Sequence, residues 1–320
     1  MDWKKLLPII GIIVLVYILW RFNIEKILLV FSTINPLYAI LCFFGVPITF
    51  FILNIQWRMI LKRQSIHVSF IYSLKNLLIG YFYGFITPGG FGAFLRALYL
   101  KNESKTPLPK CISNIITFNT IDYITIYFLG SIGGLFLLGQ YPYLFILILI
   151  LLFIVTFLFI FFLRQKTSKY LFEKLLQTQI FQFIQHYMKD PIESFYEDLP
   201  SFKSLLLPFL VSFFSWFIFY TELYFIAQLF DIHIPYITFV FMLAVTSSIA
   251  VIPISIYGLG TRDATLVALF SVYNIPPENS ISFTLFWFTI FIITPSSIGA
   301  FITVLENKKL PFKKTKLKSY

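Results

Sequence analysis

Two arginines stand within long apolar stretches of the chain, each shortly after a glycine-rich interruption: Arg96 follows Gly92, and Arg262 follows Gly260. A guanidinium group gives planar, forked hydrogen bonds to phosphate, and the free N–H groups at the start of a helix add further donors. The arginines and the breaks together predict a cradle for a phosphate headgroup. The predicted substrate-binding residues are Arg96, Arg262, Gly89, Gly90, Gly92, Ser255, Gly258 and Gly260.

Three acidic residues in similarly apolar surroundings are the candidate charge partners. Asp122 lies midway along the run at 109–138, Glu222 lies within the run at 205–230, and Asp263 adjoins Arg262. A charge in hydrocarbon is costly unless it is paired or functional. We expect these acids to keep the arginines paired when the site is empty. For Asp122, a role as a proton carrier is the less favoured alternative.

Each of these residues also has a purely structural explanation. Arg96 could extend its guanidinium to the cytoplasmic headgroups, as long basic side chains do near helix ends. Arg262 and Asp263 could simply neutralise each other, and Glu222 could pair with a polar neighbour. The glycines could allow close helix packing. These alternatives remain open at the level of the sequence.

The sequence predicts no catalytic residue, metal site or cofactor. Cys42 and Cys111 form no paired framework, and His67, His186 and His233 are scattered without metal-ligand spacing. The phosphate-binding loop G-x-x-x-x-G-K-[ST] and the nucleophile motif G-x-S-x-G are also absent.

The elements that must position these residues are membrane helices. Hydrophobic residues make up 58% of 320 positions and charged residues only 12%, too little charge for a soluble surface. Spanning helices need about 20 apolar residues. They are predicted at about 5–21, 37–60, 109–138, 141–163, 205–230 and 281–304. Two further stretches, about 70–100 and 236–273, are interrupted by Pro and Gly.

Basic loops indicate how these elements cross the membrane. Lys and Arg cluster in some loops and are missing from those near 139–143, 231–235 and 274–280. All strongly basic loops fall on the cytoplasmic side only if both interrupted stretches are re-entrant hairpins. The net charge of +11 therefore reflects topology and lipid headgroups, and no nucleic acid partner is predicted.

The predicted fold is an all-α polytopic membrane protein with about six spanning helices and two Pro/Gly-broken re-entrant hairpins in an inverted repeat. Broken segments at matching positions of two halves point to a transport site near the midplane; ordinary kinked helices are the alternative. One transmembrane domain is expected over 1–306, with halves at about 37–163 and 205–306. A cytoplasmic linker, amphipathic at 168–188 and with solvated acids at Glu193, Glu197 and Asp198, is expected at 164–203. A basic cytoplasmic tail is expected at 307–320.

The second break carries a family resemblance. The segment 252–264, Ile-Pro-Ile-Ser-Ile-Tyr-Gly-Leu-Gly-Thr-Arg-Asp-Ala, resembles the signature IPISxGGLGxREA of the lysylphosphatidylglycerol synthase transmembrane-domain family, also called the flippase-like domain family. Pro88 to Gly92 with Arg96 resembles the family's earlier P-x-x-x-G-[ED]-x-x-R element, and Asp122 matches the acid of its ERxxD stretch. The resemblance covers about 5–306, almost the whole chain.

Several positions depart from the family pattern. Ala93 stands where the family often has an acid, Phe118 and Asn119 replace its Glu-Arg pair, and Tyr257 takes a position often occupied by Gly, while Asp263 conservatively replaces Glu. The first half conforms less well than the second. The resemblance therefore supports a role for Arg262 more than for Arg96.

The resemblance implies a membrane protein that moves a phospholipid or a lipid-linked intermediate of polyprenyl-phosphate type between leaflets. Relatives that synthesise lysylphosphatidylglycerol carry a soluble aminoacyltransferase domain, and we expect this chain to lack it. A transporter in the cell membrane, with both termini cytoplasmic, is preferred to the alternatives. These are a membrane enzyme, or a subunit of one, acting on lipid-linked glycans or lipid headgroups, and a scaffold for a soluble partner. The expected partners are membrane lipids and, in addition, a partner enzyme.

Overall fold

A computed structural model of the chain describes residues 24–165, 167–170 and 191–307, and within this part regular structure is helical throughout. Five stretches are long and apolar enough to cross a membrane. They are Pro36–Arg63, Leu108–Phe136, Pro142–Leu163, Phe202–Gln228 and Pro277–Glu306. These confirm the predicted spans from 37 onward, whereas the span at 5–21 lies outside the described residues.

Most of these stretches are single helices, and two are interrupted. α7 (Leu108–Phe136), α8 (Pro142–Leu163) and α12 (Phe202–Gln228) are continuous. The first stretch comprises α3 (Pro36–Cys42) and α4 (Gly45–Arg63). The last comprises α15 (Pro277–Phe288), the π-helix η3 (Thr289–Ile293) and α16 (Thr294–Asn307).

The two interruptions predicted from Pro and Gly are confirmed, and each divides a pair of shorter helices. α5 (Phe70–Phe85) leads through the 3-10 helix η2 (Pro88–Leu95) into α6 (Arg96–Ser104). α13 (Tyr236–Ala250) leads through a turn into α14 (Thr261–Ser271), which packs back against it. In this turn Gly258 has φ +75°, and a Cβ there would lie 2.6 Å from the Cβ of Ala250. Only glycine combines this backbone with so close an approach.

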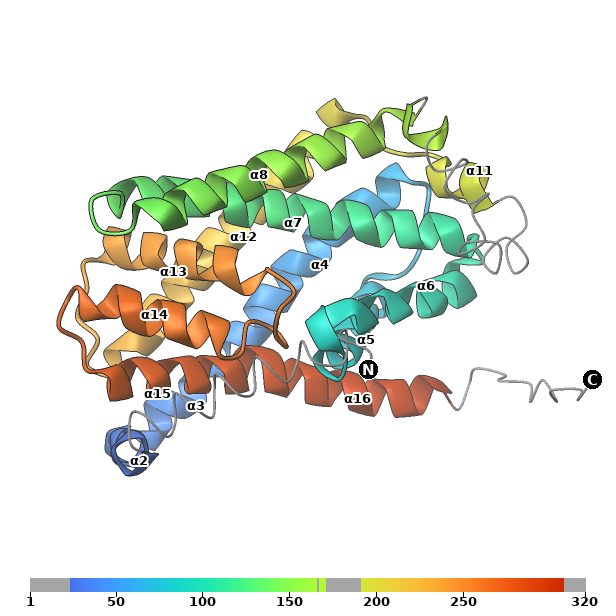
Figure 1. Cartoon of the computed structure of the whole chain (residues 1–320). Coiled ribbons are helices and arrows are strands. Elements are labelled where there is room, and N and C mark those ends of the chain that lie inside the picture. Colours follow the sequence, from blue (N-terminus) through green and yellow to red (C-terminus); the bar gives the residue numbers. More distant parts are fainter. Residues whose placement is uncertain (1–23, 166, 171–190, 308–320) are drawn as a thin grey trace, which may run out of the picture.

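α7 lies at the centre of the packing and makes its most extensive contact with α13 (Figure 1). The contact is close because α7 presents glycine at two positions. A Cβ on Gly133 would lie 2.5 Å from the carbonyl oxygen of Phe241, and a Cβ on Gly130 would overlap the Ser248 hydroxyl. Small residues let helix backbones approach in this way inside a membrane.

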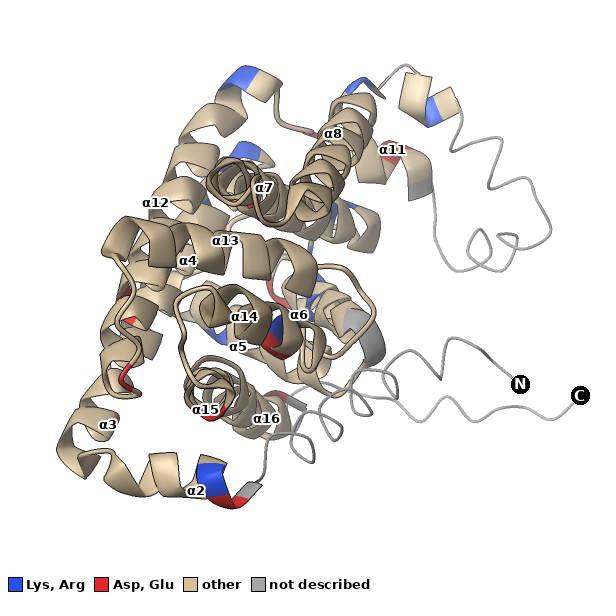
Figure 2. Ribbon diagram, turned by 60° about the vertical axis from the view of Figure 1, so that its left-hand side comes forward, with Lys and Arg blue, Asp and Glu red and all other residues tan. Residues whose placement is uncertain are grey.

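The outer helix α8 runs alongside α7 (Figure 1), and half of its residues are exposed. Only Ile148 and Phe159 of α8 are buried. An apolar helix exposed in this way matches a lipid-facing position, because lipid rather than protein then covers its side chains. In the described part of the chain, most of the length of the long helices carries no charge, and basic residues gather near helix ends (Figure 2).

A charged clamp fixes the end of the linker to α7. Lys110, near the start of α7, lies 2.7 Å from Asp198 and 3.2 Å from Glu197, which follow the short helix α11 (Pro191–Tyr196). The hydrogen bond from Lys110 lowers the pKa of Asp198. Glu197 and Asp198 remain about half exposed and are therefore solvated, but they are also paired with Lys110.

A further helix, α2 (Ile24–Thr33), precedes the first long apolar stretch and packs against α15. The amphipathic segment predicted at 168–188 and the tail at 307–320 lie almost entirely outside the described residues. The division into halves at about 37–163 and 205–306 stays a prediction.

Candidate functional site

The face of α5 that carries Gly80 and Gly84 is where the two breaks come together. A Cβ on Gly80 would lie 2.8 Å from Cδ of Arg96, so the arginine side chain lies across this glycine. A Cβ on Gly84 would overlap the hydroxyl group of Tyr257, which belongs to the turn between α13 and α14. Residues four apart share one helix face. One face of α5 therefore holds the arginine of the first break and the tyrosine of the second.

Tyr257 reaches α5 from a strained backbone. Its φ is +48°, in the left-handed region that bulky residues rarely adopt. Its ring stacks on Tyr81 with centroids 5.8 Å apart, and its hydroxyl donates a hydrogen bond of 3.4 Å to the Tyr81 carbonyl. Backbone strain of this kind costs about 1–3 kcal/mol and persists only where the surroundings enforce it. Tyr257 therefore docks the second break onto the first hairpin.

Arg96 is a buried cation held by aromatic rings. It is only 4% exposed, and its guanidinium carbon lies 4.8 Å from the Trp57 ring and 5.3 Å from the Phe118 ring. One terminal nitrogen donates a long hydrogen bond of 3.4 Å to Asn119, while Nε finds no hydrogen-bond partner in the part of the chain that the structure describes. Among the described residues no carboxylate lies within 4.0 Å of the guanidinium. A buried positive charge with so few hydrogen bonds would be stabilised by an anion as a further partner.

Asp122 joins three helices near this cation. Its Oδ1 accepts hydrogen bonds from Gln56 of α4 at 2.8 Å and from Ser212 of α12 at 2.7 Å. It is also near enough to Arg96 to interact with it electrostatically. One turn beyond Ser212, the indole N–H of Trp216 is buried without a hydrogen-bond partner among the described residues. The interior of the bundle thus contains polar groups that its own side chains leave unsatisfied.

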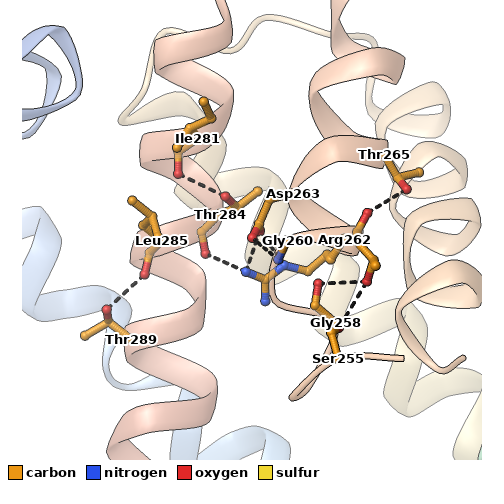
Figure 3. Close-up of polar contacts among 11 residues, drawn as sticks. Ser255, Gly258, Gly260, Arg262, Asp263, Thr265, Ile281, Thr284, Leu285 and Thr289 are labelled. Atoms are coloured by element: carbon orange, nitrogen blue, oxygen red, sulfur yellow. Dashed lines mark hydrogen bonds and ion pairs between the residues drawn. The ribbon is translucent and has the colours of Figure 1, made fainter. Parts of the chain in front are cut away.

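Arg262 has its partner beside it, as Figure 3 shows. Its Nε and Nη2 both donate to Oδ1 of Asp263, at 3.0 and 2.7 Å, and Nη2 also reaches the Thr284 carbonyl at 3.3 Å. The rings of Trp287 and Phe288 flank the guanidinium at 4.7 and 5.2 Å. The pair is almost fully buried. Arg262 and Asp263 therefore neutralise each other in this structure, which is one of the alternatives that the sequence left open.

Asp263 has a second structural task. Its Oδ2 accepts a hydrogen bond of 2.8 Å from the backbone N–H of Gly260, at the start of α14 (Figure 3). A carboxylate at this position satisfies a free donor and complements the helix dipole. Ser255 lies in the preceding turn, where its hydroxyl pairs with that of Thr261 at 3.2 Å. A phosphate would have to compete with Asp263 to reach Arg262. The role of Arg262 in binding a headgroup therefore stays a prediction.

The remaining candidates occupy distinct places. Glu222 accepts a hydrogen bond of 3.0 Å from Thr49 of α4, and its Oε1 is buried without a partner. The N–H of Gly92 donates to the Thr87 hydroxyl at 2.7 Å. Gly89 and Gly90 lie in η2, and Gly90 has φ +71° with open space around its Cβ position. Headgroup binding by the glycines and the role of Glu222 as a charge partner stay predictions.

Comparison with known proteins adds the family. Residues 7–299 match the model of the Lysylphosphatidylglycerol synthase TM region. The chain belongs to this family. It is similar to a UPF0104 membrane protein of Methanocaldococcus jannaschii, with 26% identity covering 98% of each chain. It is also similar to a UPF0104 membrane protein of Pyrococcus horikoshii, with 24% identity covering 96% of this chain and 98% of that one.

Membership of the Lysylphosphatidylglycerol synthase TM region family and the five long apolar helices make the chain a multi-pass membrane protein. Three positions at which the sequence departs from the motifs it resembles form contacts here: Phe118 and Asn119 contact Arg96, and Tyr257 contacts α5.

Sequence reasoning missed the cradle around Arg96. Trp57 gave no signal, because one tryptophan in a spanning helix is unremarkable. The spacing of Gly80 and Gly84 is the small-xxx-small pattern of close helix contacts, and it could have marked the docking face of α5.

Proposed function

We propose that this protein moves an anionic lipid headgroup between the two leaflets of a membrane, with Arg96 as the cation that binds it. One observation carries the proposal: the buried guanidinium of Arg96 lies against α5, where the two breaks meet, and is held between aromatic rings with no carboxylate of the described residues within 4.0 Å. Carrying an uncovered phosphate through hydrocarbon is prohibitively costly. A fixed cation lowers that cost while the acyl chains stay in the lipid.

The aromatic cradle suits a cation that must be charged but unoccupied for part of a cycle. Cation–π contacts stabilise a guanidinium by roughly 0.5–2 kcal/mol each without using its N–H donors. Its donors, apart from the one directed at Asn119, therefore stay available for phosphate oxygens. Family membership supports a lipid-related substrate, and the candidates are a phospholipid and a polyprenyl phosphate. The basic helix ends are taken to face the cytoplasm.

Leaflet exchange in proteoliposomes tests the proposal. The purified protein is reconstituted with a fluorescent anionic phospholipid or a fluorescent polyprenyl phosphate, and a membrane-impermeant quencher reports how fast label leaves the inner leaflet. Hydrogen bonds to charged groups contribute about 1.5–3 kcal/mol, so Arg96→Gln should slow exchange roughly tenfold or more. Arg96→Lys keeps the positive charge and loses the forked hydrogen bonds, so its exchange rate should fall between those of the wild type and Arg96→Gln.

Arg63→Gln is the matched control, because Arg63 is an exposed arginine at the end of α4. It should exchange lipid at the wild-type rate. Exchange by Arg96→Gln at the wild-type rate, with both labelled lipids, would refute the role of Arg96.

A further inference from the structure

A second lipid site is suggested by a cavity of about 510 Å³ on α4 and the loop that follows it. Its lining includes Ile55, Arg58, Met59, Lys62, His67 and Phe70. Positions 55, 58, 59 and 62 follow helical spacing, so they form one stripe along α4. Trp57, which holds Arg96, is fully buried on another face of the same helix. The cavity is therefore distinct from the Arg96 site.

The loop that closes the cavity is firmly fixed. Ser65 adopts φ +55°, and the N–H of Ile66 returns to the Leu61 carbonyl at 2.9 Å, which is a Schellman-type helix end. Gln64 donates to the Ser113 hydroxyl of α7 at 3.2 Å. The walls are therefore held in place without a ligand.

Arg58 is preoriented within this cavity. One terminal nitrogen donates to the Val68 carbonyl at 2.9 Å, and the guanidinium lies 5.6 Å from the Phe70 ring. A guanidinium has five N–H donors. The hydrogen bond to Val68 leaves donors free for a second acceptor.

The charge of the cavity is of one sign. Arg58 and Lys62 are cationic, His67 adds a ring nitrogen that can form a hydrogen bond, and none of the lining residues is acidic. Asp198 lies near Ser65 of the same loop, but Lys110 engages it at 2.7 Å. Basic pockets at the cytoplasmic ends of membrane helices bind anionic headgroups.

The order of the lining residues along α4 identifies the ligand as a lipid rather than a free anion. α4 ends a candidate membrane span at Arg63. Ile55 lies deepest within this span, Arg58 and Met59 follow one turn later, Lys62 lies at the end of the span, and His67 lies in the loop beyond it. With a rise of 1.5 Å per residue, the stripe from Ile55 to Lys62 is roughly 10 Å long. Apolar contacts inside and cationic groups outside match an acyl chain joined to an anionic headgroup.

We propose that this cavity binds one anionic phospholipid through Arg58, Lys62 and His67. The phospholipid lies with its phosphate at the basic end and the start of its acyl chains against Ile55 and Met59. The site goes beyond the proposed function, because occupancy here requires no transfer between leaflets.

Native mass spectrometry of the protein in detergent tests the site by counting bound lipids during titration with phosphatidylglycerol. Lys62→Gln/His67→Gln changes two exposed side chains and leaves the Arg58 hydrogen bond intact. Each basic residue near a phosphate contributes about 1 kcal/mol, or roughly fivefold. This allowance applies to Lys and Arg, and Lys62→Gln/His67→Gln removes one of them, so binding of one lipid should weaken about fivefold in this variant. When Arg58→Gln replaces His67→Gln, two are removed and binding should weaken about 30-fold.

Controls separate this site from its alternatives. Lys101→Gln removes an exposed lysine at the end of α6 and should keep every bound lipid. Arg96→Gln should also keep this lipid, even though it is expected to slow exchange, so the two proposals can fail separately. Phosphatidylcholine and inorganic phosphate should not displace phosphatidylglycerol. The proposal is overturned if either displaces it, or if Lys62→Gln/His67→Gln binds as much lipid as Lys101→Gln.

Discussion

The fit of the Tyr257 hydroxyl against Gly84 can be broken and then restored. Gly84→Ala places a methyl group well inside van der Waals contact distance of that hydroxyl oxygen, and the ring carbon that bears the hydroxyl, Cζ, lies 3.2 Å away. Overpacking a well-filled interior costs about 1–3 kcal/mol. Tyr257 cannot yield easily, because it is stacked on Tyr81 and fixed by the backbone on either side. We expect Gly84→Ala to lower the free energy of unfolding by this amount.

Tyr257→Phe removes the oxygen that collides. By itself it loses a hydrogen bond of 3.4 Å, which should cost no more than about 0.5–1 kcal/mol. In the double variant Gly84→Ala/Tyr257→Phe, the contact that remains is the ring carbon at 3.2 Å, so a shift of a few tenths of an ångström suffices. The double variant should therefore be more stable than Gly84→Ala alone.

Reversible unfolding of purified protein in mixed micelles, followed by tryptophan fluorescence, gives the four free energies of this cycle. Contacting residues show coupling of about 0.5–3 kcal/mol, whereas independent sites add within about 0.5 kcal/mol. Additive effects would show that Tyr257 does not occupy the face of α5. Leaflet exchange by the same variants would show whether this contact also controls transfer.

Two further expectations concern charged pairs. Arg262→Leu should lower the free energy of unfolding by about 3–5 kcal/mol, because it leaves Asp263 buried and unpaired. The double variant Arg262→Leu/Asp263→Leu should lower it by less. Unfolding in micelles compares the two variants, and equal losses of stability would contradict pairing as the cause. Pairing with Lys110 lowers the pKa of Asp198 in the folded protein, so its stabilisation is present above the ordinary Asp pKa of about 4 and is lost as the pH falls through the lowered value. In the wild type, protease cleavage within 191–201 should rise over that acid range. In Lys110→Gln, cleavage should already be high at neutral pH. Equally low cleavage of both proteins at neutral pH would show that Lys110 does not hold this segment.

The spans and breaks could be predicted from sequence because they depend on local composition. Long apolar runs and the positions of Pro and Gly place α7, α8 and α12 to within a few residues. The same reasoning found the interruptions near Pro88 and Gly258, because these residues limit which backbone the chain can form. The π-helix within 281–304 was missed, since nothing in its composition distinguishes it from ordinary helix.

The candidate site could be predicted only in part. The adjacency of Arg262 and Asp263 suggested their pairing, but not that both guanidinium donors would be directed at one oxygen. The contacts of Arg96 with Trp57 and Phe118 join residues far apart in the sequence, and local patterns carry no information about them. Asp122 was expected beside an arginine, whereas its hydrogen bonds come from Gln56 and Ser212. Tertiary packing decides such choices.

The glycine contact between α7 and α13 limits how this protein can change shape. α7 belongs to the first expected half and α13 to the second, yet their backbones approach so closely that Gly133 meets the Phe241 carbonyl directly and only the Ser248 hydroxyl lies against Gly130. Two halves interlocked along such a seam cannot rock apart as rigid bodies without exposing backbone to lipid. Alternating access would then have to come from local rearrangement of η2 and the turn at 251–260, with α7 and α13 serving as the stationary frame.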